Sequence, residues 1–163
     1  MAKQHKGSSQ MKITMDQVKS LRAKTNAGIM DAKKALEESK GDMGMAEAWI
    51  KKKGLARAEK KANRETTAGV IIAYTHHNFA SGTLIELNCE TDFVAKTDDF
   101  MNLAKEIAMQ ANSMNPANNK ELLAQEYNRD PSMTIEELIK QTSGKLGENI
   151  VLKRFSRFSI GDE

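Results

Sequence analysis

The sequence predicts an α+β protein in which an amino-terminal three-helix bundle precedes an α+β core with a small antiparallel sheet. Apolar residues recur at helical spacing up to residue 54, and they alternate at strand spacing in three short stretches after residue 67. The charge also changes sign along the chain. Residues 1–64 hold 16 Lys and Arg against 7 Asp and Glu, whereas residues 65–163 hold 9 against 15. A change of this kind indicates a boundary between two structural units.

Composition narrows the class of protein. The 163 residues are 39% hydrophobic and 29% charged, which is enough for a modest core, and their richness in Ala, Lys, Glu and Met favours helices. One cysteine cannot form an intrachain disulfide, and neither an apolar span nor a secretory leader is visible. We therefore expect a cytoplasmic protein, with residues 1–11 as a disordered tail.

The first two helices are defined by a cap and a turn. Thr14 and Gln17 have capping-box spacing at the start of the first helix. Gly28 is expected to provide the sharp turn that separates the first helix from the second. The second helix is expected over about 29–39, because small and apolar residues recur there at helical spacing: Ala32, Ala35 and Leu36.

The third helix completes a bundle over residues 12–54. Asp42 is a suitable N-cap for this helix. We expect the helix to end at Lys53, with Gly54 adopting a left-handed conformation as its cap. The following segment, 55–66, has helix-forming composition, a basic character and few large apolar groups. It is therefore predicted to be a separate, solvated connecting helix.

The core, residues 67–163, is expected to begin with a β-hairpin. The stretch VIIAY is β-branched and aromatic, HNFASG contains a turn, and TLIELNCE alternates, with Ile85, Leu87 and Cys89 on one face. A long amphipathic helix follows and stops near Asn115-Pro116.

Two more helices and a strand complete the predicted core. KELLAQEY is expected to form a short helix, and a second capping box at Thr134–Glu137 opens a helix that runs to about Leu146. Residues 151–160 alternate enough to form a third strand. Because more than one helix separates the second and third strands, the arrangement is α+β rather than a regular β-α-β repeat.

Covalent chemistry is not indicated. His76 and His77 are neighbours, and neighbouring side chains of a strand point to opposite faces, so we expect solvated or hydrogen-bonded loop histidines rather than a metal site. Cys89 is expected to be a buried core thiol. No phosphate-binding glycine motif or nucleophile motif is present. We therefore predict no catalytic residues, no metal and no cofactor.

The segment Thr91–Lys96 lies where a strand gives way to a helix. Phe93 has two interpretations here. In one, a single helix from residue 92 to residue 111 buries Phe93 in the same stripe as Phe100. In the other, Thr97 starts a new helix, and Phe93 is an exposed aromatic anchor for a partner. The pattern of residues alone leaves both open.

Three separated stretches together resemble the elongation factor Ts family, whose members exchange the nucleotide of the GTPase elongation factor Tu. They are VKSLRAKTNAGIMDAKKALE at 18–37, LNCETDFVAKT at 87–97 and GENIVLKRFS at 147–156. With compatible spacing between them, the resemblance covers about residues 14–160. It implies an amino-terminal ubiquitin-associated-like bundle followed by an α+β core, as expected above.

The resemblance also implies partner-binding residues. One group enters elongation factor Tu near its magnesium and phosphate site, led by an Asp-Phe pair, which favours the anchor interpretation of Phe93. A second group, in the amino-terminal domain, packs on a helix of the nucleotide domain of the GTPase. The first group is Thr91, Asp92, Phe93, Val94, Ala95 and Lys96, and the second is Leu21, Thr25, Gly28, Ile29 and Met30.

One departure from the family concerns its longer members, which carry a second core subdomain. This sequence resembles a short form with a single core half. Short forms can meet the requirement for two halves by pairing two chains, so we expect a homodimer, with 151–160 as a candidate edge strand. A monomer in which this strand lies inside its own sheet is the alternative.

Other classes of function remain open from the residues alone. The basic first half and the run Lys51–Lys53 would suit an RNA- or ribosome-associated module, although no aromatic RNA-binding signature accompanies them. A ubiquitin-binding module rests on fold analogy alone. We predict a nucleotide exchange factor that acts on elongation factor Tu, with no membrane and no direct nucleic-acid partner.

Overall fold

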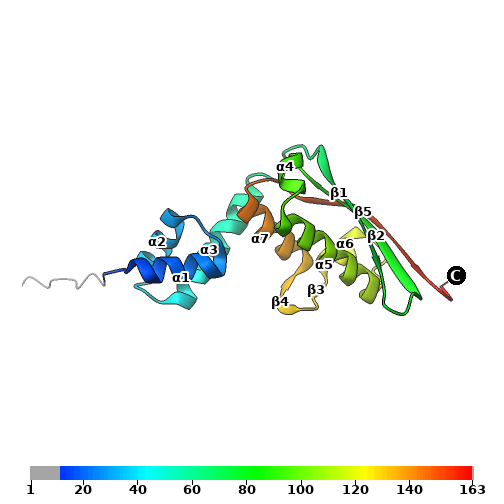
Figure 1. The fold of residues 1–163 in the computed structure, drawn as a ribbon, viewed down its shortest axis with the longest axis horizontal. Coiled ribbons are helices and arrows are strands. Elements are labelled where there is room, and N and C mark those ends of the chain that lie inside the picture. Colours follow the sequence, from blue (N-terminus) through cyan, green and yellow to red (C-terminus); the bar gives the residue numbers. More distant parts are fainter. Residues whose placement is uncertain (1–11, 163) are drawn as a thin grey trace, which may run out of the picture. The chain divides into compact units, whose positions relative to one another are not determined.

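The computed structural model describes residues 12–162, and the chain divides into two compact units, residues 1–53 and 54–163 (Figure 1). The fold is α+β, with a small helical amino-terminal unit and a carboxy-terminal unit that contains a three-stranded antiparallel sheet. The predicted tail, residues 1–11, lies outside the described residues.

The first unit contains helices α1 (Met15–Thr25) and α2 (Ile29–Glu38) and most of α3 (Met43–Glu59). The predicted capping box is present, with the Thr14 side chain accepting from the backbone N–H of Gln17 at 3.3 Å. Asp42 Oδ1 accepts from the backbone N–H of Met45 at 2.7 Å, as expected of an N-cap. The helices enclose a core of small and branched side chains: Val18, Leu21, Ala32, Ala35, Leu36 and Ala46.

Two expectations for glycines in this region were wrong. Gly28 is the N-cap of α2 with a φ of −61°, a conformation open to any residue, and the left-handed residue of that turn is Asn26, with a φ of 52°. Gly54 does not end α3, which continues to Glu59 and is followed by turns. The predicted separate helix over 55–66 is therefore absent from the structure.

Another helix approaches the backbone of α3 closely at Gly54, and the glycine that permits this approach lies in that other helix. In α7 (Ile135–Leu146), a Cβ on Gly144 would lie 2.3 Å from the carbonyl oxygen of Gly54. The backbones of the two helices thus meet at a pair of glycines, both of which belong to the second unit. From the sequence, a glycine after an apolar stretch is expected to end a helix. The alternative, that another helix crosses there, cannot be inferred from local sequence because the crossing helix is 90 residues away.

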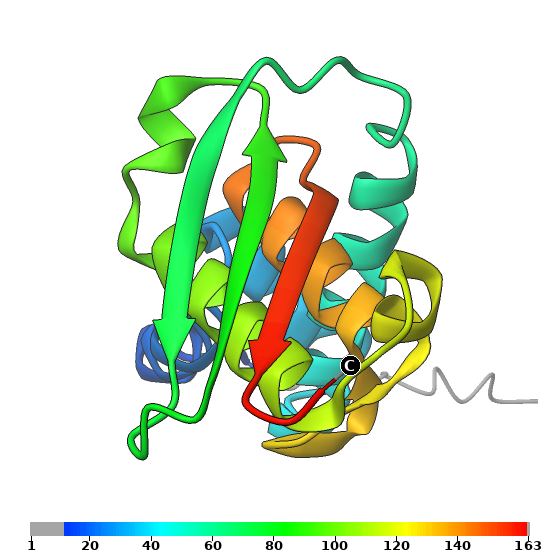
Figure 2. The same ribbon diagram turned by 90° about the vertical axis from the view of Figure 1, so that its right-hand side faces the viewer.

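The second unit is built on an antiparallel sheet in the order β1-β2-β5, with β1 at Ala68–Thr75, β2 at Ser81–Cys89 and β5 at Val151–Ser159. The predicted hairpin and third strand are both present. Helix α5 (Asp98–Met114) packs along one face of this sheet, and the other face faces the viewer in Figure 2 without a helix of this unit over it.

The remaining elements close the core on the helical side of the sheet. They are α4 (Asp92–Ala95), α6 (Asn119–Ala124), β3 (Glu126–Tyr127), β4 (Asp130–Thr134) and α7. The predicted end of α5 at Asn115 and the capping box at Thr134–Glu137 are both present. The helix expected over KELLAQEY ends at Ala124, and its last two residues, Glu126 and Tyr127, form β3 instead. The short β3-β4 hairpin was not predicted, since its few residues show no strand alternation. Apolar side chains of β2, α5 and α7 meet in the centre: Ile85, Leu87, Phe100, Leu103, Ile107 and Ile139.

Candidate functional site

The segment Thr91–Lys96, here called the projecting turn, is a short helix enclosed by two caps. The Thr91 side chain accepts from the backbone N–H of Val94 at 3.4 Å and begins α4. The Thr97 hydroxyl donates to the carbonyl oxygen of Val94 at 2.8 Å and accepts from the backbone N–H of Phe100 at 3.3 Å. Thr97 therefore ends one helix and starts the next, so the predicted fresh start of a helix at this residue is confirmed.

Burial alternates sharply within this turn. Val94 and Ala95 belong to the core of the second unit, whereas Phe93 is 80% exposed. Asp92 and Lys96, on either side, are also exposed. A single helix from residue 92 to residue 111 would have buried Phe93 with Phe100, but the break at Thr97 turns Phe93 outward. The interpretation of Phe93 as a core residue is therefore wrong.

Cys89 lies at the base of the projecting turn and is fully buried, as expected. Its Sγ donates to the carbonyl oxygen of Thr91 at 3.2 Å. Burial raises the pKa of the Cys89 thiol, and the carboxylates of Glu148 and Asp92 act in the same direction. A thiol in this environment stays protonated, which agrees with a structural role rather than a nucleophilic one.

The residues of the amino-terminal group lie around the turn between α1 and α2. Ile29 and Met30 are 52% and 75% exposed in the first turn of α2. Thr25 shapes the preceding turn, since its hydroxyl donates to the carbonyl of Leu21 at 2.7 Å and accepts from the N–H of Ala27 at 3.3 Å.

Leu21 does not belong to that surface. It is fully buried in the core of the first unit, and Gly28 carries no side chain. The sequence resemblance groups Leu21 with its neighbours, but a helix places residues three or four apart on one face, and Leu21 shares the buried face of α1 with Val18. The exposed apolar surface of this group is therefore the pair Ile29 and Met30.

The histidine pair lies at the turn between β1 and β2. The rings of His76 and His77 have centroids 4.2 Å apart, and His76 Nδ1 lies 3.1 Å from the hydroxyl of Tyr74. The expectation of loop histidines with a hydrogen bond is confirmed, since β1 ends at Thr75. The two rings nevertheless lie side by side and not on opposite faces, because strand alternation ends with β1. Within residues 12–162, no three metal-binding side chains come together and no helix is long and apolar enough to cross a bilayer.

The face of the sheet that α5 leaves uncovered was not identified from the sequence. It presents exposed apolar side chains on all three strands, among them Ile71, Leu84 and Phe158. The register pairs Ile71 with Glu86 and Gly82 with Phe158, so these residues lie on one face. The sequence did indicate this face. Ile71 and Ile72 are adjacent, so they point to opposite faces of the sheet, and a strand that is apolar on both faces can be packed on both.

Comparison with known proteins gives one consistent family. A family model described as elongation factor TS matches residues 90–163. A protein of Methylacidiphilum infernorum named "Elongation factor Ts" is 40% identical over 194 aligned positions, which cover 93% of this chain and 96% of that protein. Another of the same name, from Fervidobacterium nodosum, is 40% identical over 197 positions, which cover 93% and 100%.

A third protein of that name, from Aquifex aeolicus, is 45% identical over 157 positions, which cover 93% of this chain but 54% of that protein. Coverage of 93% includes residues of both structural units. The similarity therefore extends well beyond the segment that contains the projecting turn.

Proposed function

The chain belongs to the elongation factor Ts family, and from this premise we propose that it is a guanine nucleotide exchange factor that promotes the release of GDP from elongation factor Tu. Such a protein acts by binding and performs no covalent chemistry of its own. The observation that supports this most directly is the exposure of Phe93 at the tip of a capped and internally anchored turn.

The proposed role of the projecting turn is to enter the GTPase near its magnesium and phosphate site. Burying the ring of Phe93 in the partner removes a large apolar surface from water, so exposing it in the free protein has a cost that binding recovers. Asp92, next to Phe93, brings a negative charge to a region where the partner holds phosphates and a cation, and so competes with groups that retain the nucleotide.

Exchange then follows from linkage. A GTPase holds its nucleotide through a phosphate-binding loop and a magnesium ion, which makes unassisted release slow. If the exchange factor binds the nucleotide-free GTPase more tightly than the loaded form, each ligand weakens the binding of the other by the same factor. The projecting turn supplies this difference, because its contact and the bound magnesium compete for the same region.

The proposed second contact is made by the amino-terminal unit. Ile29 and Met30 provide an exposed apolar pair in the first turn of α2, held by the ordered turn at Thr25. Their role is to dock on a helix of the nucleotide domain, which adds affinity without touching the nucleotide site. We expect this contact to set how tightly the two proteins bind, and the projecting turn to set how fast the nucleotide leaves.

We also propose a homodimer formed through the uncovered face of the sheet. Its apolar side chains would leave water if a second copy packed on them about a twofold axis. The same face carries Glu86 and Arg154, whose side chains pair at 2.7 Å. Because both charges lie on one face, a twofold copy can set its Arg154 near Glu86 and leave neither unpaired.

The contacts of β5 favour a dimer in which the two sheets pack face to face over a dimer in which their edge strands pair. Asn119 Nδ2 donates to the carbonyl oxygens of Leu152 and Lys153, at 3.2 Å and 2.9 Å, along the outer edge of β5. Part of that edge is therefore covered by α6, next to β5 in Figure 2, and is not free to add another strand.

The test of the proposed function is the release of fluorescent GDP from elongation factor Tu. Substoichiometric amounts of the chain are expected to accelerate release through many turnovers. A Phe93→Ala variant is expected to lower the rate at saturating chain by about tenfold or more, since a large anchor is lost. Phe79→Ala is the matched control, because Phe79 is 81% exposed on a different turn, and it should retain most of the stimulation.

The outcomes separate the candidate functions. No acceleration by the parent chain would contradict the exchange function, and retention on RNA that falls with salt would then favour the RNA-associated module. Equal losses in Phe93→Ala and Phe79→Ala would instead contradict a specific role for the projecting turn.

A further inference from the structure

We propose that Glu148 is a positioning residue that fixes the orientation of the projecting turn and thereby the direction in which Phe93 is presented. The effect of Glu148 on nucleotide release rests on the proposed function, whereas its effect on the position of the turn rests only on contacts among the described residues. Glu148 lies between α7 and β5, 57 residues along the chain from Thr91.

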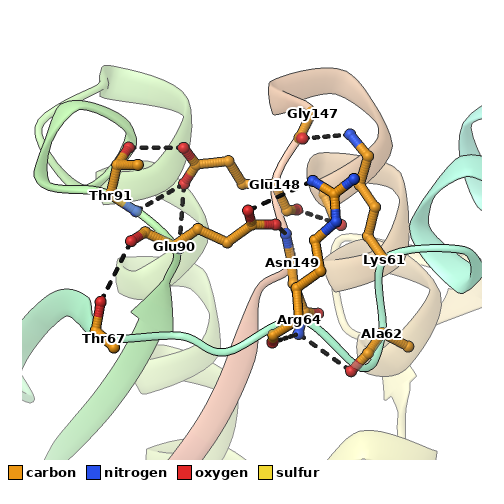
Figure 3. Close-up of polar contacts among 10 residues, drawn as sticks. Lys61, Ala62, Arg64, Thr67, Glu90, Thr91, Gly147, Glu148 and Asn149 are labelled. Carbon is orange, nitrogen blue, oxygen red and sulfur yellow. Dashed lines mark hydrogen bonds and ion pairs between the residues drawn. The ribbon is translucent and has the colours of Figure 1, made fainter.

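Both carboxylate oxygens of Glu148 bind the base of the turn (Figure 3). Oε2 accepts from the backbone N–H of Glu90 at 3.1 Å and from that of Thr91 at 3.0 Å, and Oε1 accepts from the Thr91 hydroxyl at 2.6 Å. Strand β2 ends at Cys89, so these two amides lie just beyond it. One ionised side chain thus satisfies three donors with charge-assisted hydrogen bonds.

The bond to the Thr91 hydroxyl has a further consequence. A hydroxyl has a single proton, and here that proton is directed to Glu148, which leaves the lone pairs of the oxygen for the N–H of Val94. The carboxylate, the hydroxyl and the amide form a chain that leads from Glu148 into the first turn of α4. Glu148 therefore sets the rotamer of the residue that caps the projecting turn.

A reciprocal set of contacts holds Glu148 itself in place. Glu90 Oε1 accepts from the backbone N–H of Asn149 at 2.7 Å, and the Ser143 hydroxyl donates to the carbonyl oxygen of Glu148 at 2.5 Å. The Asn149 side chain donates to the carbonyls of Ala62 and Arg64, at 3.1 Å and 2.8 Å. The base of the turn is thus fastened to the loop before β5, and that loop to the segment after α3 (Figure 3).

These contacts go beyond what burial provides. Val94 and Ala95 attach the turn to the core, but apolar packing is not directional and tolerates small rotations about the helix axis. The ring of Phe93 is exposed and extends farther from the helix axis than the methyl groups of Val94 and Ala95, so a given rotation displaces the ring more than it displaces the buried side chains. Directional hydrogen bonds at the base restrict that rotation, which is how an exposed anchor can be held ready for a partner without contacts of its own.

The test compares Glu148 with a carboxylate of similar exposure elsewhere in the same unit. Glu106 accepts from the Tyr127 hydroxyl at 2.8 Å and pairs with Arg129 at 3.0 Å, so Glu106→Gln removes a bound carboxylate without touching the turn. Glu148→Gln keeps one carbonyl acceptor but loses the charge and the second acceptor oxygen. Glu148→Ala loses the charge and both acceptor oxygens. The measurements are amide hydrogen exchange at Glu90, Thr91 and Val94, GDP release from elongation factor Tu at saturating chain, and the half-saturating concentration.

We expect Glu148→Ala to remove the protection of these amides from exchange and to lower the maximal rate of GDP release by about tenfold, because Phe93 remains but is no longer held in one orientation. Glu148→Gln should have an intermediate effect on both. The half-saturating concentration should change by less than about threefold, because the amino-terminal contact remains. Glu106→Gln should leave both release parameters at the parent values. If Glu148→Ala does not fold, Glu148→Gln carries the same comparison.

Two results would overturn the positioning role. One is a parent-like release rate in a folded Glu148 variant, and the other is an equal loss of rate in Glu106→Gln and Glu148→Gln. Failure of the proposed function is a separate result: the parent chain itself would not accelerate release. In that case, unchanged amide protection in the Glu148 variants would still overturn the structural claim, and lost protection confined to the turn would support it.

Discussion

Polar side chains buried in the second unit connect elements that apolar packing alone would leave in several arrangements. Gln110, in the middle of α5, donates from Nε2 to the carbonyl oxygen of Glu126 at 3.0 Å and accepts from the N–H of Asn128 at 3.1 Å. Across the described residues, every buried side-chain nitrogen or oxygen has a partner. Because an unpaired buried amide is costly, Gln110 selects the one position in which the β3-β4 hairpin meets it.

Tyr127, in that hairpin, should make stability depend on pH in alkaline solution. Burial, reinforced by the hydrogen bond to Glu106, raises the pKa of Tyr127 from 10.0 to about 12. Below pH 10 the phenol is neutral in both states. Between pH 10 and about 12 it ionises only when the chain unfolds, so the free energy of unfolding falls as the pH rises through this window.

A Tyr127→Phe variant tests this, since it has no phenol to ionise. At pH 7 the variant should be less stable by about 1 kcal/mol, the usual net value of a lost hydrogen bond. The difference between parent and variant in the free energy of unfolding should shrink as the pH rises from 10 to about 12. Lysines also lose charge in this range, but they do so in both proteins. A difference that stays constant with pH would contradict the raised pKa.

At the scale of elements, the ends of helices follow local rules and their crossings do not. The capping boxes at Thr14 and Thr134 satisfy backbone amides within three residues, and both helices begin where the sequence predicts. The crossing of α3 and α7 instead depends on Gly144, which lies against the backbone of Gly54, 90 positions away in the sequence.

The two glycines should respond very differently to the same substitution. In Gly144→Ala the new Cβ would lie 2.3 Å from the Gly54 carbonyl oxygen, so the helices must separate, and we expect a loss of about 2 kcal/mol in the free energy of unfolding. In Gly54→Ala the Cβ meets nothing within 4 Å, and the helix gains up to about 1 kcal/mol from propensity. Urea unfolding followed by circular dichroism measures both, and equal effects would refute the close crossing.

At the scale of the whole molecule, the proposed function divides between the two units. The first carries the exposed pair Ile29 and Met30, and the second carries the projecting turn. Two contacts with separate roles can be separated experimentally, because one affects the binding of the partner and the other the step in which the nucleotide leaves.

A double variant, Ile29→Asp with Met30→Asp, should weaken the complex with elongation factor Tu by about tenfold or more, since charged groups would replace an apolar contact. GDP release at saturating concentrations of the variant should stay within about twofold of the parent. Met45→Asp is the matched control, because Met45 is also exposed but lies in α3, beyond the other end of α2. Titration by calorimetry gives the affinity, and an unchanged affinity would exclude docking through this pair.

The proposed homodimer makes a prediction about mass. The parent chain should sediment at twice 18.1 kDa at micromolar concentrations, and Phe158→Asp should shift it to the monomer, because a charge would enter an apolar interface. Met114→Asp, at the end of α5, adds the same charge away from the uncovered face and should leave the dimer intact. A monomeric parent chain in analytical ultracentrifugation would reject the dimer.

Most of the fold could be predicted from short-range pattern. The caps at Thr14 and Thr134, the end of α5 at Asn115 and the alternation around Ile85 each depend on residues a few positions apart, and each is present. The predictions for Gly28 and Gly54 were wrong because a glycine permits a left-handed or sharply turned backbone but does not require one. Leu21 was misplaced for a related reason, since a resemblance in sequence does not distinguish core from surface.

By itself, the sequence determined the α+β class, the order of the main helices and strands, and the family. All of these depend on spacing and residue type along the chain. Only the tertiary structure decided that Phe93 is exposed, that Leu21 is buried and that Glu148 holds the base of the projecting turn. Exposure and hydrogen bonding depend on which segments pack together in space, and the contacts of Glu148 with the projecting turn join residues 57 and 58 positions apart.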